Sequence, residues 1–235
     1  AFLATGNATY KELAKFHFDE TYARAWNAEL GGGLLWSTAA DSKNACVNGP
    51  GAIAACFLYQ ILEDPSYREK AEAIYAWERS HLFDEDTGAV WDNMRADGRI
   101  SRRVFSYNTG TFIGAANSLS KLTGDQTYLA DAEKAADYTR ARLCRDGILP
   151  DYRGGDASGF NGIFIRWLAR FAGDNQRWPK YHGWLVQNAN AAWSARRLDG
   201  LSWNRWQRPT PDDTLRAWAC TDSVVVMQVI PLKPR

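Results

Sequence analysis

Aromatic and polar side chains gather in four stretches of this sequence. Tryptophan and tyrosine rings offer flat apolar faces with a polar edge, which suits packing in a core and also stacking against sugar rings. Asp, Asn and Arg beside them could exchange hydrogen bonds with hydroxyl groups. The residues in question are Trp36 and Lys43; Trp91, Asp92, Asn93, Arg95, Arg102 and Arg103; Asp151, Tyr152, Arg153 and Asp156; and Trp203, Trp206, Asp212 and Asp213.

The elements that must position these stretches are revealed by an internal repeat of about sixty residues. Three markers recur in the same order along the chain: a turn ending in Tyr, an Asn followed by Gly ahead of an apolar segment, and Gly-x-x-Trp in the long connections. The turns end at Tyr10, Tyr67 and Tyr128; the asparagines are Asn48, Asn108 and Asn161; the Gly-x-x-Trp segments begin at Gly33, Gly88 and Gly200.

Two kinds of helix alternate within the repeat. Residues 46–62 contain no charge and residues 108–123 contain one, whereas residues 125–142 place charges opposite an alanine-rich face. A charge-poor helix must be buried on most sides and an amphipathic one on a single side. The pattern predicts an all-α ring or stack of helical hairpins with a buried inner layer. The expected helices are 8–28, 46–62, 65–82, 106–123, 125–143, 160–173, 177–197 and 214–229, with residues 1–6 as the last turn of another.

The repeated polar and glycine residues have simple structural interpretations. Each asparagine is expected to cap the N-terminus of an inner helix, and Pro50 to lie in a first helical turn. Gly6 and Gly124 are expected to end helices in the left-handed conformation. Asp212-Asp213 is interpreted as the cap and loop of the last helix, and Lys43 as a solvated surface residue. All inner helices would then begin at one end of the assembly, where the long connections form a polar and aromatic mouth.

Composition excludes several classes of function. The 28 basic and 27 acidic residues give a net charge of +1, without the electrostatic footprint of a nucleic-acid or membrane-surface binder. No uninterrupted apolar run reaches the length of a membrane span. Cys46 and Cys56 lie about 15 Å apart on one expected helix and cannot form a disulfide. No spacing of Cys or His resembles a structural zinc site.

Several motifs, taken together and in order, resemble glycoside hydrolase family 76, the α-1,6-mannanases. They are GGGLLWS (31–37), KNACVN (43–48), TGAVWDN (87–93), SYNTGTFIGA (106–115) and GFNGIFIRWL (159–168). The resemblance implies an (α/α)6 barrel of six hairpins, and the likeness covers essentially all 235 residues. Counting helices, we expect a single α/α-toroid domain over residues 1–235 that lacks its N-terminal hairpins, so that the barrel is incomplete.

The resemblance also implies which residues bind substrate and which are missing. The catalytic pair of the family, two adjacent aspartates at the start of an inner helix, would fall upstream of Ala1, so neither carboxylate is assigned. No metal or organic cofactor is implied. The residues expected to line a groove for α-mannan or manno-oligosaccharide are Trp36 and Trp91 as stacking faces, Asn48, Asp92, Asn108 and Asp156 as hydroxyl partners, and Tyr107 and Phe160 as walls. A packing role for the two tryptophans, or a turn-capping role for Asp92, is an equally simple interpretation.

The resemblance therefore implies an endo-acting hydrolase of α-1,6-mannosidic linkages, exported to the cell envelope or outside the cell because its substrate is a wall polysaccharide. One carboxylate would attack the anomeric carbon while the other protonates the leaving oxygen and later activates water. Two alternatives remain. One is another six-hairpin carbohydrate enzyme, an unsaturated glucuronyl hydrolase or a sugar epimerase, although His17, His81 and His182 all lie outside the mouth connections. The other is a non-catalytic glycan-binding scaffold.

Overall fold

Helices are the main secondary structure of the computed structural model, which describes residues 1–230. They are α1 (Phe2–Thr5), α2 (Ala8–Ala25), α3 (Ala45–Leu62), α4 (Pro65–Leu82), α5 (Ser106–Thr123), α6 (Thr127–Tyr138), α7 (Phe160–Asp174), α8 (Trp178–Ser194) and α9 (Ala217–Val229). Short turns lie at η1 (Glu29–Gly31), η2 (Thr139–Leu143) and η3 (Gly155–Gly159). The sequence predicted every one of the longer helices, and it gave α4 and α5 their observed bounds.

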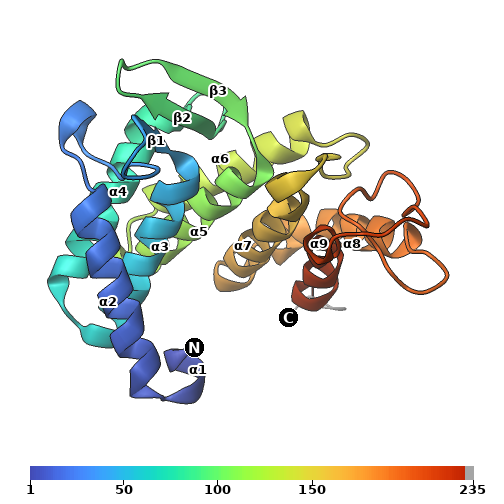
Figure 1. Ribbon diagram of the computed structural model, residues 1–235, viewed down its shortest axis with the longest axis horizontal. Helices are drawn as coiled ribbons and strands as arrows, with labels where there is room; N and C mark the ends of the chain where they lie inside the picture. Colours follow the sequence, from blue (N-terminus) through green and yellow to red (C-terminus); the bar gives the residue numbers. More distant parts are fainter. Residues whose placement is uncertain (231–235) are drawn as a thin grey trace.

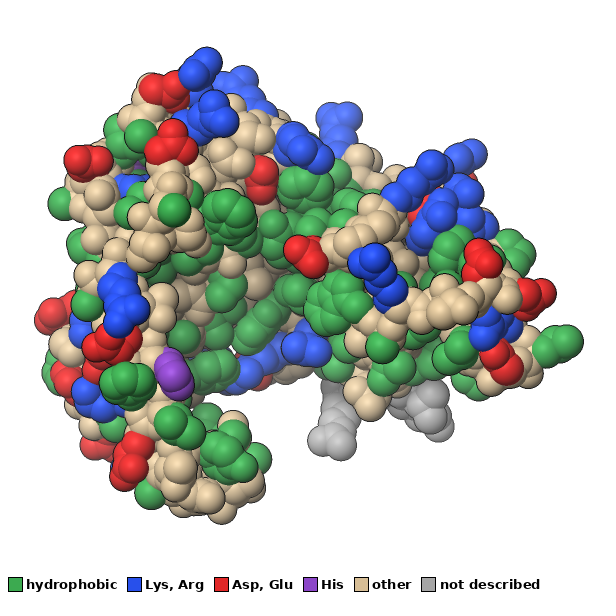
Figure 2. All heavy atoms as spheres, viewed as in Figure 1, with side chains coloured by type: hydrophobic (Ala, Val, Ile, Leu, Met, Phe, Trp, Pro, Cys, Tyr) green, Lys and Arg blue, Asp and Glu red, His purple; other side chains and the backbone are tan. Residues whose placement is uncertain are grey.

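The helices alternate between two layers that form an open arc (Figure 1). The inner layer is α3, α5, α7 and α9, each packed against the next, and the outer layer is α2, α4, α6 and α8. In Figure 1, α2 and α9 stand at the two ends of the arc, and Figure 2 shows hydrophobic side chains lining the hollow between its arms. This is the alternation of charge-poor and charged helices that the repeat predicted.

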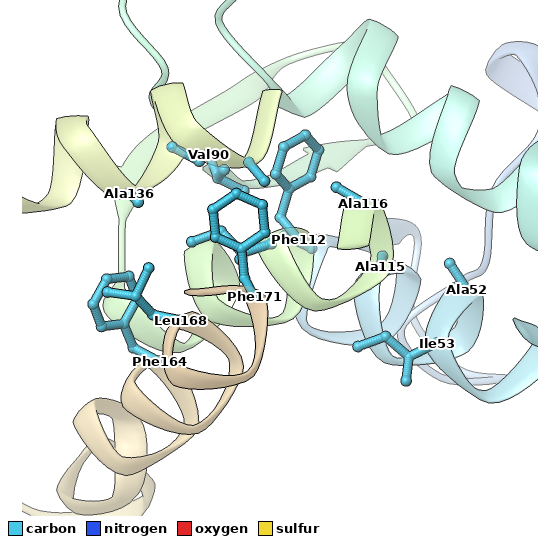
Figure 3. Close-up of a cluster of buried hydrophobic side chains, with 14 of the residues drawn as sticks. Ala52, Ile53, Val90, Phe112, Ala115, Ala116, Ala136, Phe164, Leu168 and Phe171 are labelled. Atoms are coloured by element: carbon cyan, nitrogen blue, oxygen red, sulfur yellow. The ribbon is translucent and has the colours of Figure 1, made fainter. Parts of the chain in front are cut away.

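The core lies where the inner helices meet. In Figure 3, buried side chains from α3, α5 and α7 converge, among them Ile53 of α3, Phe112 of α5 and Phe171 of α7. Small residues permit this approach: a Cβ added at Gly110 would lie 2.5 Å from the Cα of Phe164. Each fully buried aromatic side chain contributes about 2–3 kcal/mol of transfer free energy to such a core.

A small sheet is the main feature that the sequence analysis missed. Strands β1 (Ser42–Asn44), β2 (Trp91–Arg95) and β3 (Ile100–Val104) form an antiparallel sheet in the order β1-β2-β3, over the start of the inner helices. The signal was present, since Asp97-Gly98 is a hairpin dipeptide. Gly98 has φ of +80°, and the Asp97 carboxylate accepts a hydrogen bond from the Arg99 backbone N–H at 3.0 Å. Two of the long connections are therefore ordered by strand pairing.

Several predicted helix ends are wrong by a few residues. Helix α2 stops at Ala25, because the next residues turn into the bridge between Trp26 and Leu34. After α6 the chain continues as the π-helical turn η2. Helix α9 begins at Ala217, so Asp212 and Asp213 do not cap it.

The asparagine caps are also wrong, because Asn48 and Asn108 lie inside their helices. Helix α3 is preceded by Asn44 and helix α5 by Phe105. Pro50 is likewise the sixth residue of α3 and not part of its first turn. Both asparagines are buried: Asn48 bonds to Leu34 in the connection before β1 and Asn108 to Asp92 on β2, so they tie other segments to their helices instead of ending them.

The turns at the opposite end are as expected. Gly6 and Gly124 end α1 and α5 in the left-handed conformation, with φ of 69° and 78°. At the start of α2 the Asn7 side chain accepts from the Thr9 N–H at 3.0 Å, and at the start of α4 the Asp64 carboxylate accepts from the Ser66 N–H at 2.9 Å. These ends are stabilised by contacts within a few residues of chain.

Candidate sugar-binding site at the mouth of the inner helices

Four aromatic rings meet where α5 and α7 begin. The centroids of Tyr107 and Phe160 are 3.8 Å apart, and both Phe105 and Tyr152 lie beside Phe160, at 5.6 Å and 5.2 Å. Phe105 immediately precedes α5, Phe160 is the first residue of α7, and Tyr152 comes from the connection between α6 and η3. We call Phe105, Tyr107, Tyr152 and Phe160 the aromatic wall. The two predicted wall residues, Tyr107 and Phe160, are thus in direct contact.

A polar cluster borders Tyr107. The Asn108 amide donates to the carboxylate of Asp92 at 3.3 Å, and the neighbouring Asn93 amide donates to the same carboxylate at 2.9 Å. Asn108 is fully buried, and within residues 1–230 its amide oxygen has no hydrogen-bond partner. The site therefore contains the Asp92 carboxylate, held by two amides, and the unpaired amide oxygen of Asn108.

Cys46 links this cluster to α3. The Tyr107 hydroxyl exchanges a hydrogen bond with the Cys46 thiol, and burial raises the pKa of both groups. The negative charge of Asp92 acts in the same direction on both. Since a raised pKa keeps the phenol and the thiol neutral at ordinary pH, Tyr107 contributes a neutral hydroxyl and an aromatic face.

The two predicted stacking tryptophans differ in position. Trp91 is half-buried on β2, next to Asp92, with the guanidinium of Arg102 4.9 Å from its ring centre. Trp36 is 58% exposed on the connection to β1, where its backbone N–H donates to the Ser42 carbonyl at 2.9 Å. In residues 1–230 no ring contact joins Trp36 to the aromatic wall. Trp91 packs against the hydrophobic core, and within residues 1–230 it has no ring contact with the aromatic wall either, so a stacking role for both tryptophans stays a prediction.

The other two predicted hydroxyl partners do not join the cluster. Asn48 is fully buried, and its amide oxygen accepts from the Leu34 N–H at 2.8 Å while its nitrogen donates to the Leu34 and Asn44 carbonyls. It pins a long connection to α3. Asp156 is exposed in η3, where its backbone carbonyl accepts from the Trp218 indole at 3.0 Å.

Lys43 is not the surface residue that the sequence suggested. It is 3% exposed and donates to the backbone carbonyls of Asn27, Glu29 and Gly32, while burial lowers its pKa. Its ammonium organises the loop before β1. A single lysine in a polar connection gave no sequence signal of burial.

The residues that the sequence analysis missed are those that bind the inner helices to one another. Ser106 donates through its hydroxyl to the Asn161 amide oxygen at 2.9 Å, and its backbone N–H donates to the Tyr152 hydroxyl at 2.8 Å. Asp222 of α9 accepts from the first backbone N–H groups of α7. Asp222 could have been noticed as the only acidic residue of the expected helix 214–229.

The described residues contain one adjacent aspartate pair near the mouth connections, Asp212-Asp213, and it is exposed in the loop before α9. The Asp213 carbonyl accepts from the Arg197 guanidinium at 2.8 Å, which ties this loop to the end of α8. Neither aspartate reaches the aromatic wall through any contact that residues 1–230 provide. Among those residues no group of three or more His, Cys, Asp or Glu side chains is placed to hold a metal ion.

Comparison with known proteins identifies a family over nearly the whole chain. The model of glycosyl hydrolase family 76 matches residues 2–230. Among solved structures, the α-1,6-mannanase of Salegentibacter sp. HEL1_6 is 34% identical with a TM-score of 0.91, covering 97% of this chain and 70% of that one. One of its structures is an inactive variant, with two adjacent aspartates replaced by alanine, in complex with α-1,6-mannotetrose.

Two curated relatives are fungal. The mannan endo-1,6-alpha-mannosidase DCW1 of Candida glabrata is 29% identical over 119 residues, which are 46% of this chain and 27% of that protein. The meiotically up-regulated gene 191 protein of Schizosaccharomyces pombe is 29% identical over 160 residues, 61% of this chain and 34% of that protein. The chain thus spans about a third of the length of these relatives. The helical-hairpin architecture and the mannanase resemblance expected from the motifs are confirmed.

Proposed function

This chain belongs to glycosyl hydrolase family 76, and from that premise we propose that the protein is an endo-acting hydrolase of α-1,6-mannosidic linkages in mannan. The observation that carries the proposal is the 34% identity, over 97% of the chain, to a mannanase whose structure holds an α-1,6-linked tetrasaccharide. The family and these structures do not favour a glucuronyl hydrolase, an epimerase or a binding scaffold.

The geometry of the mouth supports a sugar as ligand. The Tyr107–Phe160 pair offers an apolar face, and the Asp92 carboxylate beside it is held by two amides. Sugars present apolar C–H faces and a rim of hydroxyls, so a ring and an oriented acceptor side by side suit them. In this proposal Tyr107, Phe160 and Trp91 shape the groove, the Asp92 carboxylate accepts from sugar hydroxyls, and the buried Asn108 orients that carboxylate.

The chemistry itself requires two carboxylates. By resemblance to the family, they would be two adjacent aspartates, one forming the glycosyl intermediate and the other transferring the proton, and we assign neither role to a residue of this sequence. The residues described here would bind and orient the mannan chain against that pair. The reaction needs no proton carrier among the three histidines of the chain.

Two further parts of the proposal concern location. Because mannan is a polysaccharide of the cell envelope, we place the enzyme outside the cytoplasm.

Helix α3 is long and apolar enough to cross a membrane by length and composition, so the expectation of no such helix is not confirmed. We infer that α3 is a core helix, since it lies in the inner layer between α4 and α5.

The test uses the full-length protein and α-1,6-linked mannan. Endo action predicts oligosaccharides as early products, detected by chromatography, whereas release of mannose alone would contradict it.

Binding of α-1,6-mannotetraose, measured by calorimetry, should weaken by about tenfold or more in Tyr107→Ala and Asp92→Ala. Trp193→Ala is the matched control, because Trp193 is 55% exposed on α8 and within residues 1–230 has no ring contact with the aromatic wall. Equal binding of an α-1,4-linked glucan would also argue against the proposal.

A further inference from the structure

A carboxylate from the inner helix α9 caps the N-terminus of the neighbouring inner helix α7. The two oxygens of Asp222, on α9, accept from the backbone N–H groups of Asn161 at 3.2 Å and of Gly162 at 2.8 Å. These are the second and third residues of α7, whose own N-cap, Gly159, has no side chain to serve them. The first N–H groups of a helix have no partner within it, and an ionised acceptor is the strongest cap for them. Asp222 is 1% exposed, so no solvent replaces it.

The capped turn is also tied to α5. The Asn161 side chain accepts from the Ser106 hydroxyl at 2.9 Å and donates to the Pro150 carbonyl at 3.0 Å. Ser106 is the first residue of α5 and Asn161 the second of α7. Hydrogen bonds therefore join the second turn of α9 to the start of α7 and the start of α7 to that of α5, and Tyr107 extends the series to α3 through Cys46.

The packing leaves this first turn little freedom. A Cβ added at Gly162 would lie 2.5 Å from the near oxygen of Asp222, and one added at Gly159 would lie 2.0 Å from the Trp218 ring. The residue between these glycines that faces the mouth is Phe160. Its ring lies 3.8 Å from that of Tyr107, and it immediately precedes the two residues that bond to Asp222.

We propose that Asp222 is a positioning residue of the sugar site: by capping α7 from α9, its carboxylate fixes the first turn of α7 and so holds Phe160 against Tyr107 in the aromatic wall. It does not touch the sugar. Its effect on binding rests on the proposed function, whereas its effect on the first turn of α7 does not.

The surroundings of Asp222 make its charge responsive to pH. Burial raises its pKa to about 7, against the opposing effect of the Gly162 and Asn161 N–H groups. Two titratable groups, Arg166 of α7 and Cys220 of α9, line a cavity of about 480 Å³ together with Asp222. Two more come from neighbouring segments: Asp156 lies in η3, and Tyr152 interacts electrostatically with Asp222. A protonated carboxyl loses the charge that strengthens both caps, so the first turn should loosen below neutral pH.

The first experiment is amide hydrogen exchange on the full-length protein with Asp222→Asn. The amide side chain keeps the shape but can accept from only one of the two N–H groups. We expect exchange of the first turn of α7, corrected for intrinsic rates, to be at least about tenfold faster than in the parent. Asp212→Asn is the matched control, an exposed aspartate of the preceding loop, and should change nothing. Unchanged exchange in Asp222→Asn would overturn the proposal.

The second experiment separates positioning from mere structure. Affinity for α-1,6-mannotetraose should fall about tenfold in Asp222→Asn, and the parent should lose affinity as pH falls through about 7 while the variant stays flat. Equal affinity and equal pH profiles would leave Asp222 as a structural cap only and would overturn its role at the site. If the variant does not fold, the pH dependence of exchange in the parent decides the cap by itself. If the parent binds no manno-oligosaccharide, the proposed function is wrong. The exchange experiment then still tests whether Asp222 caps the first turn of α7.

Discussion

The two ends of the inner helices are built on different principles. At the end away from the mouth, short turns are capped by side chains two residues away, as with Asp64 and Ser66 or Asp125 and Thr127. At the mouth, the helix starts are held by residues 55 to 61 positions away, as with Ser106 and Asn161 or Asn161 and Asp222. The local end can form before the ring is assembled, whereas the mouth exists only when neighbouring hairpins have docked.

This difference explains why the candidate site is at the mouth. A side chain that bonds to the first turn of its own helix does not fix the position of that helix relative to its neighbours. Asn108, inside α5, instead reaches Asp92 on β2, and Tyr107 reaches Phe160 of α7. A groove assembled from several helices needs such contacts, because a misplacement of about 1 Å already harms binding and catalysis.

The largest expected effect comes from a mouth glycine. Gly33 has φ of +91°, and an added Cβ would lie 2.4 Å from the Trp77 ring, so Gly33→Ala should cost about 3 kcal/mol or more of unfolding free energy. Gly124→Ala, at the opposite end, has φ of +78° with open space around it and should cost only about 1–2 kcal/mol. Urea unfolding of both variants measures the two values. Similar losses would show that the mouth connection is no more constrained than an outer turn.

The next effect is that of a buried asparagine. Asn161→Ala removes an acceptor from Ser106 and a donor from Pro150, leaving two polar groups unsatisfied, and should cost about 2–4 kcal/mol. Asn7→Ala removes one exposed local cap and should cost about 1 kcal/mol. Thermal or urea unfolding compares them. If the local cap cost more, the contrast between the two ends would be false.

A third prediction concerns Glu78, which is fully buried on α4 and has no hydrogen-bond partner among residues 1–230. Burial raises its pKa well above the ordinary range, so the folded protein keeps a proton that the unfolded chain has already lost. Folding stability contributed by this group therefore falls as pH rises above the unfolded pKa of about 4.3. Glu78→Gln should be more stable than the parent at pH 7, by a margin that grows by about 1.4 kcal/mol per pH unit until the folded pKa is reached.

Unfolding of Glu78→Gln and the parent at several pH values tests this prediction. Asp222 remains in both proteins, so its own titration cancels in the difference. A constant difference across pH, or a less stable variant at pH 8, would show that Glu78 is ionised in the folded protein.

The smallest effect is expected at the local caps. Asp125→Ala removes one acceptor from the Thr127 N–H and should cost about 1 kcal/mol without changing manno-oligosaccharide affinity. Calorimetric binding and thermal unfolding on the same sample measure both. A loss of affinity would mean that the two ends are coupled, contrary to the comparison.

Much of the fold was accessible from pattern alone. The period of the uncharged segments predicted α3 and α5, and glycine chemistry predicted the ends at Gly6 and Gly124. The failed predictions of helix caps at Asn48 and Asn108 share one cause. Asn48 and Asn108 were interpreted as caps because an Asn before an apolar run is a local signal, yet their partners lie on distant segments.

The sequence predicted the kind of site, an aromatic and polar one, but only some of the residues that form it. Tyr107, Phe160, Asp92 and Asn108 come together, because residues at the start of successive inner helices must share one end of the arc. Trp36 satisfied the same sequence criterion, but it is 58% exposed and no contact within residues 1–230 joins it to the aromatic wall, so its role stays a prediction. Residue type and spacing decide which end a side chain reaches, and the course of each long connection decides whether it faces its neighbours.

The sequence by itself determined the helical repeat, the alternation of inner and outer helices and the short turns, because each depends on neighbours within one or two turns of chain. Only the tertiary structure decided that Asp222 caps α7, that Lys43 is buried against backbone carbonyls, and that Tyr107 meets Phe160. Those contacts join residues far apart in the chain, and their free energy becomes available only when the helices that carry them are packed together.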